Sequence, residues 1–155
     1  MKVLVAFYSR DSHTREVARK VAEALNAEID EIIDKKNRKG IIGFLIAGYE
    51  ATRGKTTQIS FEKDPSDYDL VILGGPTWNS RVTPAIRTYL LQNRGKIKEA
   101  VFFTTCAGSS KKCLAQMEEL YGKKALFKKV IVNKKLDEET EEFIKELKDL
   151  IGSNL

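Results

Sequence analysis

The hydrophobic pattern of this chain changes from strand-like to helix-like five times in succession. Residues 2–8 form an almost continuous apolar run rich in β-branched and aromatic side chains, as in a strand that is buried on both faces. Apolar residues then recur with helical spacing at positions 17, 18, 21, 22 and 25. Four further strands are predicted at residues 27–33, 70–73, 99–104 and 125–132, and a helical pattern follows each of them.

This alternation predicts an α/β fold in three layers. Strand–helix–strand connections are right-handed, so successive strands form a parallel sheet with helices on both faces. We therefore expect a doubly wound five-stranded parallel sheet with strand order 2-1-3-4-5. A chain of 155 residues, 42% of them apolar, suits one domain spanning residues 1–155, and no linker composition divides it.

Residues 41–53 are too apolar for a free loop and are predicted to form a helix, although Gly43 and Gly48 weaken it. We expect this helix to pack closely against the sheet. Exposure of Ile41, Phe44 or Leu45 would instead indicate a homodimer or another partner surface.

Composition argues against several classes of protein. No apolar stretch approaches the roughly 20 residues of a membrane span, and the chain starts with a strand instead of a signal peptide, so we expect a cytoplasmic protein with no membrane partner. Cys106 and Cys113 lack the paired spacing of a zinc site, and with one histidine no metal site is expected. The net charge is +5, but the lysines are spread along the chain, as on a solvated surface, so no nucleic-acid partner is expected.

The loops that follow strands one, three and four are the expected ligand site. In doubly wound sheets ligands bind beyond the carboxyl ends of the strands where the strand order reverses, so residues 9–14 and 75–82 flank one crevice. The first loop offers hydroxyls and a helix start that attracts anions, the second offers Trp78, and the third offers backbone at Ala107 and Gly108. A planar ring with a phosphate tail fits all three.

Simpler interpretations of the same residues stay open. Ordinary helix capping also explains the Ser and Thr residues of the first loop. The Asp11 carboxylate either binds the free N–H groups at the helix start itself or repels an anion placed there. His13 beside the helix dipole is assigned no catalytic proton. Cys106 is expected to be a small core residue, with a redox pair to Cys113 as the alternative.

Three segments resemble the FMN-contacting loops of flavodoxin-like proteins: Ser-Arg-Asp-Ser-His-Thr at residues 9–14, Gly-Pro-Thr-Trp-Asn at residues 75–79 and Thr-Thr-Cys-Ala-Gly at residues 104–108. The resemblance covers nearly the whole chain, and the unbroken fifth strand is similar to the short-chain flavodoxin form. It implies that FMN is the cofactor and that the phosphate is held by Ser9, Arg10, Ser12, His13 and Thr14. It further implies that the flavin is contacted on one side by Pro76, Thr77, Trp78 and Asn79, and on the other by Thr105, Cys106, Ala107 and Gly108.

The chain departs from the family pattern in three respects. The family loop typically has Thr-Gly-Asn where this chain has Asp11, Ser12 and His13, which removes a flexible glycine and adds an acid. The third loop lacks the aromatic residue that many flavodoxins stack on the second flavin face. Flavodoxins are usually acidic, whereas this chain is basic.

The resemblance implies an FMN-binding redox protein that transfers electrons between partner proteins, without catalytic side chains, because the flavin carries the chemistry. By charge complementarity we expect acidic redox partners. One alternative is an NAD(P)H-dependent quinone or flavin reductase, supported by the open second flavin face and the arginines near the crevice. Another is a flavodoxin-fold scaffold that no longer binds FMN, for which Asp11 is the best argument. A receiver-type signalling domain is excluded because it needs an aspartate where this chain has Gly74 and Gly75.

Overall fold

A parallel sheet forms the centre of the protein in the computed structural model, which describes residues 1–108 and 110–154. Its strand order is β2-β1-β5-β7-β8, and every neighbouring pair on this path is parallel. The order confirms the predicted 2-1-3-4-5 arrangement. The strands are β1 (Val3–Phe7), β2 (Glu28–Glu31), β5 (Leu70–Trp78), β7 (Ala100–Cys106) and β8 (Phe127–Val132).

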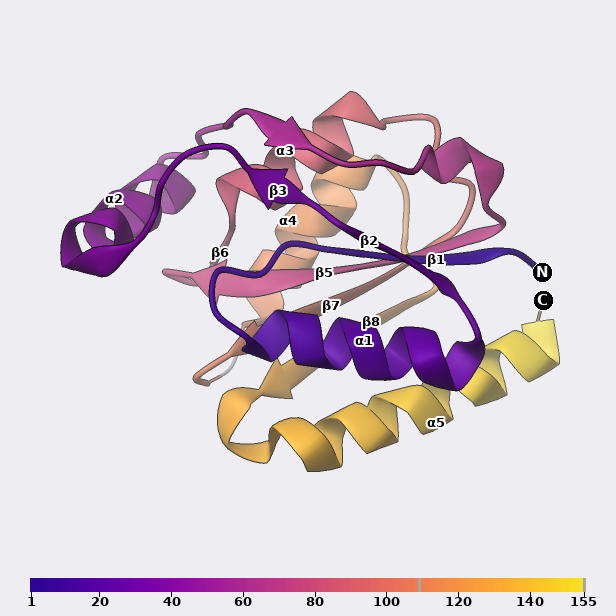
Figure 1. The fold of residues 1–155 in the computed structure, drawn as a ribbon. Helices are drawn as coiled ribbons and strands as arrows, with labels where there is room; N and C mark the ends of the chain where they lie inside the picture. Colours follow the sequence, from indigo (N-terminus) through magenta and orange to yellow (C-terminus); the bar gives the residue numbers. More distant parts are fainter. Residues whose placement is uncertain (109, 155) are drawn as a thin grey trace.

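Helices cover both faces of this sheet, as the doubly wound architecture predicts (Figure 1). The helices α1 (His13–Leu25) and α5 (Leu136–Asn154) pack together on one face, and α3 (Pro84–Gln92) and α4 (Lys111–Tyr121) on the other. Alternate residues of each central strand supply the two cores, so Leu4 and Ala6 of β1 belong to one core and Val3 and Val5 to the other. Within the described residues, no helix has both the length and the apolar character needed to cross a bilayer.

Short strands accompany the main sheet. The strands β3 (Ile33–Asp34) and β4 (Ile59–Ser60) pair antiparallel in a separate two-stranded ladder, so the strand expected at residues 27–33 is divided into β2 and β3. The strand β6 (Arg81–Val82) returns antiparallel along the end of β5. Two 3-10 helices, η1 (Pro65–Asp67) and η2 (Asn133–Lys135), complete the described elements.

The expectation that residues 75–82 form a loop is wrong. Residues 74–78 continue β5, and only Asn79 and Ser80 turn the chain, with φ angles of 50° and 61°. Two successive positive φ values are typical of a type I′ hairpin turn. Gly74 lies inside the strand because there is no room for a side chain: a Cβ there would lie 2.0 Å from Cζ of Phe103.

The expectation that residues 41–53 bury their large side chains against the sheet is also wrong. The helix α2 (Gly40–Thr52) projects at one end of the molecule (Figure 1). Its small residues face inward. Gly43, Ala47 and Ala51 are buried, four residues apart on one helix face. A Cβ on Gly43 would lie 2.4 Å from the carbonyl carbon of Arg38, so the two backbones approach too closely for larger residues on this side. The large side chains of α2 consequently face outward.

Candidate functional site

Hydroxyl contacts join the elements at the carboxyl ends of β1, β5 and β7. The buried Thr14 in the first turn of α1 places Oγ1 2.8 Å from Oγ1 of Thr105 at the end of β7. Oγ1 of Thr77 in β5 lies 2.5 Å from Oγ1 of Thr104 in β7. These contacts hold the start of α1 and the ends of both strands together, so the predicted loops lie along one edge of the sheet.

The first loop caps α1 with its own carboxylate. Oδ1 of Asp11 accepts a hydrogen bond from the backbone N–H of His13 at 3.3 Å, whereas Ser12 at the N-cap position makes no side-chain cap. The hydroxyl of Ser9 donates to the carbonyl oxygen of Asp11 and accepts from the backbone N–H of Arg15 at 3.4 Å. One of the N–H groups at the helix start is therefore already taken by an anion of the chain itself. The Asp11 side chain is 59% exposed, so it sits at the rim of the loop and does not fill it.

The guanidinium of Arg10 points away from the start of α1. Its Nε and Nη2 donate to the carbonyl oxygen of Arg38, at 3.1 and 2.8 Å, and its Cζ lies 5.6 Å from the ring centre of Phe44. Arg10 thus ties the first loop to the segment before α2. A cleft of about 360 Å³ lies beside this connection, with Tyr8, Ser9 and Arg10 along one wall.

Trp78 is half-buried at the end of β5 and lies against both β1 and the segment before α2. Its ring is perpendicular to that of Tyr8, at 81° and 5.8 Å between centres, and the Cζ of Arg38 lies 5.5 Å from its centre. An apolar cavity of about 170 Å³ lies beside it, between the end of β5 and α2, lined by Phe44, Leu45, Ala47, Gly48, Thr77, Trp78 and Asn79. The amide of Asn79 donates to the Thr52 hydroxyl at 3.3 Å, so the turn between β5 and β6 contacts α2.

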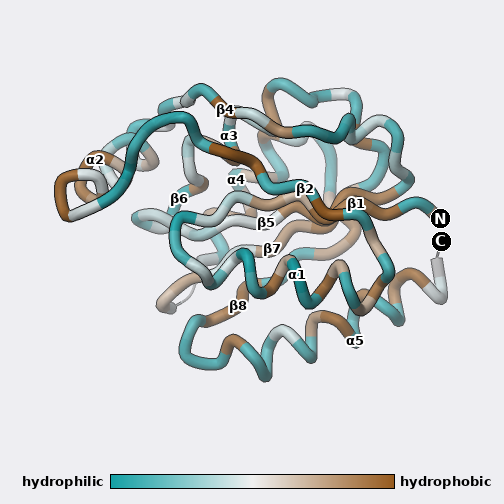
Figure 2. The backbone as a smooth tube through the Cα atoms, viewed as in Figure 1, coloured by the Kyte–Doolittle hydropathy of each residue, from teal (hydrophilic) through white to brown (hydrophobic). Residues whose placement is uncertain are grey.

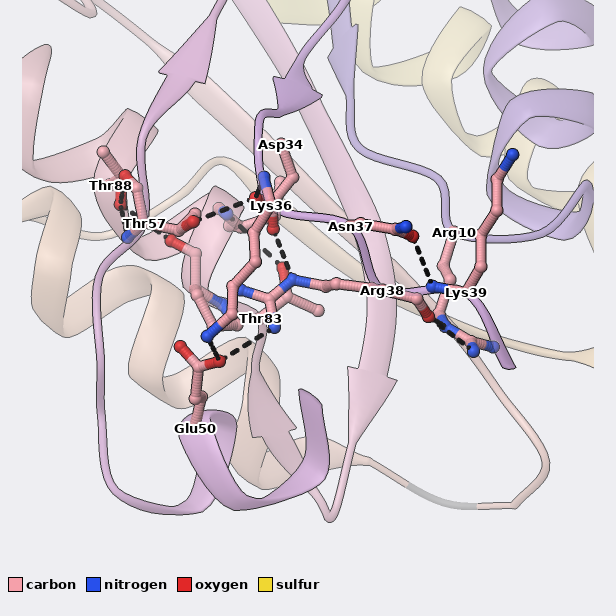
Figure 3. Close-up of polar contacts among 12 residues, drawn as sticks. Arg10, Asp34, Lys36, Asn37, Arg38, Lys39, Glu50, Thr57, Thr83 and Thr88 are labelled. Carbon is pink, nitrogen blue, oxygen red and sulfur yellow. Dashed lines mark hydrogen bonds and ion pairs between the residues drawn. The ribbon is translucent and has the colours of Figure 1, made fainter. Parts of the chain in front are cut away.

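A buried ion cluster around Arg38 was not anticipated from the sequence (Figure 3). Its Arg38 guanidinium supports the ring of Trp78. The Arg38 side chain is only 4% exposed; its Nε lies 2.6 Å from Oδ2 of Asp34, and its Nη1 lies 3.2 Å from Oε1 of Glu50. Lys36 also pairs with Glu50. Burial alone would raise the pKa of Glu50, but the hydrogen bonds to Lys36 and Arg38 outweigh it and hold the pKa below its usual range. Residues 35–40 have the composition of a turn, and nothing in that pattern marks which of their basic side chains is buried.

The third loop is open toward solvent. Ala107 and Gly108 are exposed, and a Cβ on Gly108 would meet nothing within 4 Å. Cys106 and Cys113 are buried free thiols, and burial raises the pKa of both, so neither is activated as a thiolate. The hydroxyl of Ser110, which begins α4, is buried without a hydrogen-bond partner among the described residues.

The thirteen predicted contact residues therefore fall into groups. Thr14 and Thr105 are joined directly, and Ser9 and His13 lie beside them in the first loop, where Ser12 is exposed. Pro76 and Thr77 lie within β5, and Trp78 and Asn79 turn toward α2. Arg10 binds the carbonyl oxygens of residues 38 and 40. Cys106 is the last residue of β7, and Ala107 and Gly108 follow that strand.

Comparison with known proteins identifies the architecture. No family model matches the sequence. A putative flavoprotein from Bacteroides eggerthii is similar with a TM-score of 0.76 and 22% identity, over 99% of each chain. A flavoprotein from Lactobacillus acidophilus, solved in complex with FMN, gives a TM-score of 0.74 and 22% identity over 90% of this chain and 98% of its own. Oxidised Flavodoxin 1 from Bacillus cereus gives 0.55 and 19% over the whole of both chains. The fold is flavodoxin-like. These identities are low, so they establish the fold alone.

Proposed function

We propose that the protein binds FMN at the carboxyl edge of β1, β5 and β7 and transfers electrons between partner proteins. The observation that carries this proposal is the convergence of the α1 start, Trp78 and the exposed backbone of residues 107–108 on one edge of the sheet. The structurally similar Lactobacillus acidophilus protein was solved with FMN, and the Bacillus cereus protein is a flavodoxin, which supports the same cofactor here.

The residues present fit FMN. The N–H groups of the α1 start suit a phosphate and the Ser9 hydroxyl lies beside them, whereas the Thr14 hydroxyl is buried against Thr105. Trp78 offers an aromatic surface beside an apolar cavity. The unpartnered hydroxyl of Ser110 supplies a buried donor close to the third loop. Bound FMN would supply one- and two-electron redox chemistry. Arg38 and Tyr8 would hold the Trp78 ring in place, and the exposed residues 107–108 would leave the opposite side accessible to a partner.

Asp11 is the residue that works against this proposal. Its carboxylate competes with a phosphate for the His13 N–H and adds negative charge beside it. Removing the charge while keeping the hydrogen-bond acceptor, with Asp11→Asn, should therefore strengthen FMN binding by roughly three- to tenfold.

Titration of the apoprotein with FMN tests the proposal. Trp78 is the single tryptophan of the chain. Binding can therefore be followed by two signals, the quenching of the protein's tryptophan fluorescence and the quenching of the FMN fluorescence. We expect saturable binding of one FMN, weaker binding of riboflavin, which lacks the phosphate, and tighter FMN binding by Asp11→Asn. Glu23→Gln removes a charge from a 78% exposed side chain in the last turn of α1, away from the start of that helix, and should leave FMN affinity unchanged. If the purified protein is colourless and added FMN changes neither the tryptophan nor the flavin fluorescence, the proposal is overturned. That result would favour a flavodoxin-fold scaffold that no longer binds FMN.

An NAD(P)H-dependent quinone or flavin reductase is the second candidate. The exposure of Ala107 and Gly108 favours it, because an open side of the site admits a small substrate as well as a protein. Steady-state oxidation of NAD(P)H with a quinone acceptor separates the two: a carrier alone gives negligible turnover, whereas a reductase turns over repeatedly.

A further inference from the structure

The outward side of α2 is an apolar surface that is largely exposed. Six large side chains, here called the outer face of α2, are exposed: Ile41 (81%), Ile42 (74%), Phe44 (61%), Leu45 (64%), Ile46 (39%) and Tyr49 (59%). They come from one helix at one end of the molecule, where Figure 2 shows hydrophobic colour along the tube. Exposed apolar residues gathered in this way mark a contact surface.

Basic residues flank both ends of this face. Lys35 and Lys39 precede α2, Arg53 and Lys55 follow it, and all four are exposed. The only acid in α2, Glu50, has a side chain 12% exposed that is already paired with Lys36 and Arg38. The chain as a whole carries a net charge of +5. The surface therefore has an apolar centre and positively charged ends. A partner that matches it is apolar and carries negative charge at its boundary.

This combination separates the candidate occupants. A second copy would bring the same positive ends together, and like charges at an interface are unfavourable. A protein partner normally exchanges about one hydrogen bond for each 100–200 Å² of interface, but the side chains of the outer face offer only the Tyr49 hydroxyl. A lipid surface requires neither shape complementarity nor hydrogen bonds, and anionic headgroups would meet the lysines and arginine.

Against the expectation of no membrane partner, we propose that the outer face of α2 docks on the surface of an anionic lipid bilayer. The 13-residue helix is about 20 Å long, too short to cross the bilayer, and would lie in the plane of the headgroups with its apolar side chains inserted. This orientation turns the cavity beside Trp78, which Phe44 and Leu45 also line, toward the lipid surface. The proposal does not require FMN to be bound, because it rests on the exposed side chains of α2 and on its flanking charges.

Vesicle flotation with the full-length protein tests the proposal. We expect binding to phosphatidylcholine vesicles that contain phosphatidylglycerol, much weaker binding to phosphatidylcholine alone, and a loss of binding as salt is raised. Leu45→Glu and Ile42→Glu should each lower the partition coefficient at least about tenfold, because each withdraws a large apolar side chain from the lipid. Lys39→Glu should lower it by about fivefold or more through the charge alone.

A matched variant and a mass measurement complete the test. Leu91→Glu replaces an exposed apolar side chain of α3, outside the outer face, with the same charged residue. This variant should bind vesicles as the wild type does. Far-UV circular dichroism verifies that every variant is folded. Absence of binding to anionic vesicles, or equal losses for Leu91→Glu and Leu45→Glu, would overturn the proposal. Sedimentation equilibrium showing a dimer that Leu45→Glu dissociates would assign the face to a second copy instead.

Discussion

Arg38 is the residue whose removal should most disturb the end of the molecule that carries Trp78. Arg38→Met keeps much of the aliphatic stem but withdraws the cation from Asp34 and Glu50, whose side chains are 3% and 12% exposed. Breaking a buried ion pair by removing one partner costs about 3–5 kcal/mol, because the remaining charge stays buried and uncompensated. Lys36 still pairs with Glu50 in the variant, so we expect the lower end, about 3 kcal/mol.

Urea denaturation measures this cost. Unfolding is followed by the fluorescence of Trp78, which lies over the Arg38 guanidinium, and independently by circular dichroism. For a urea dependence of 1–3 kcal/mol/M, a loss of about 3 kcal/mol lowers the midpoint by roughly 1–3 M. The double variant with Asp34→Asn should recover part of the loss, because it removes the buried carboxylate that Arg38→Met leaves without its cation.

The surface pair of Arg19 and Glu23 provides the control. Its side chains are 62% and 78% exposed with 3.7 Å between the charged atoms, so Arg19→Met should cost less than about 0.5 kcal/mol. If Arg38→Met costs no more than Arg19→Met, the reasoning that burial makes this cluster important for stability is refuted.

Two other substitutions test the packing and the charge cluster. Gly74→Ala should destabilise the protein by about 2 kcal/mol or more in thermal denaturation, because the new Cβ would lie 2.0 Å from the Phe103 ring, whereas Gly108→Ala, with nothing within 4 Å, should have little effect. Because the folded pKa of Glu50 is below its ordinary value of 4.5, its contribution to stability is complete above that pH and is lost as the pH falls through the folded pKa. The stability difference between wild type and Glu50→Gln should accordingly be largest at pH 7 and shrink toward pH 3; a difference that grows on acidification would contradict this assignment.

The layered fold was predictable because it depends on local patterns and general topology rules. The apolar runs of β1, β5 and β7 and the helical spacing of α1 and α5 are properties of short segments, visible without knowledge of their neighbours. Right-handed crossovers then bring the loops after β1, β5 and β7 to one edge, which is why residues 9–14, 75–79 and 104–108 were expected together.

The expectations that were wrong concern distances between segments remote in sequence. Gly74 and Gly75 suggest a loop when considered alone, yet they continue β5 because Phe103 and Ile86 occupy the space beside them. Asp11 is a local case: its two alternatives at the helix start could not be ranked from the sequence, and its contact with the His13 N–H two residues later distinguishes them.

The sequence by itself determined the number, type and order of the layers, because the spacing of apolar residues is a local property of each segment. Only the tertiary structure decided which side of α2 is buried and which of several basic residues near it is enclosed. A helix apolar on nearly every side has no preferred face of its own, so the choice follows from how closely its backbone approaches residue 38. That approach admits Gly43 and Ala47 and turns Ile41, Phe44 and Leu45 outward.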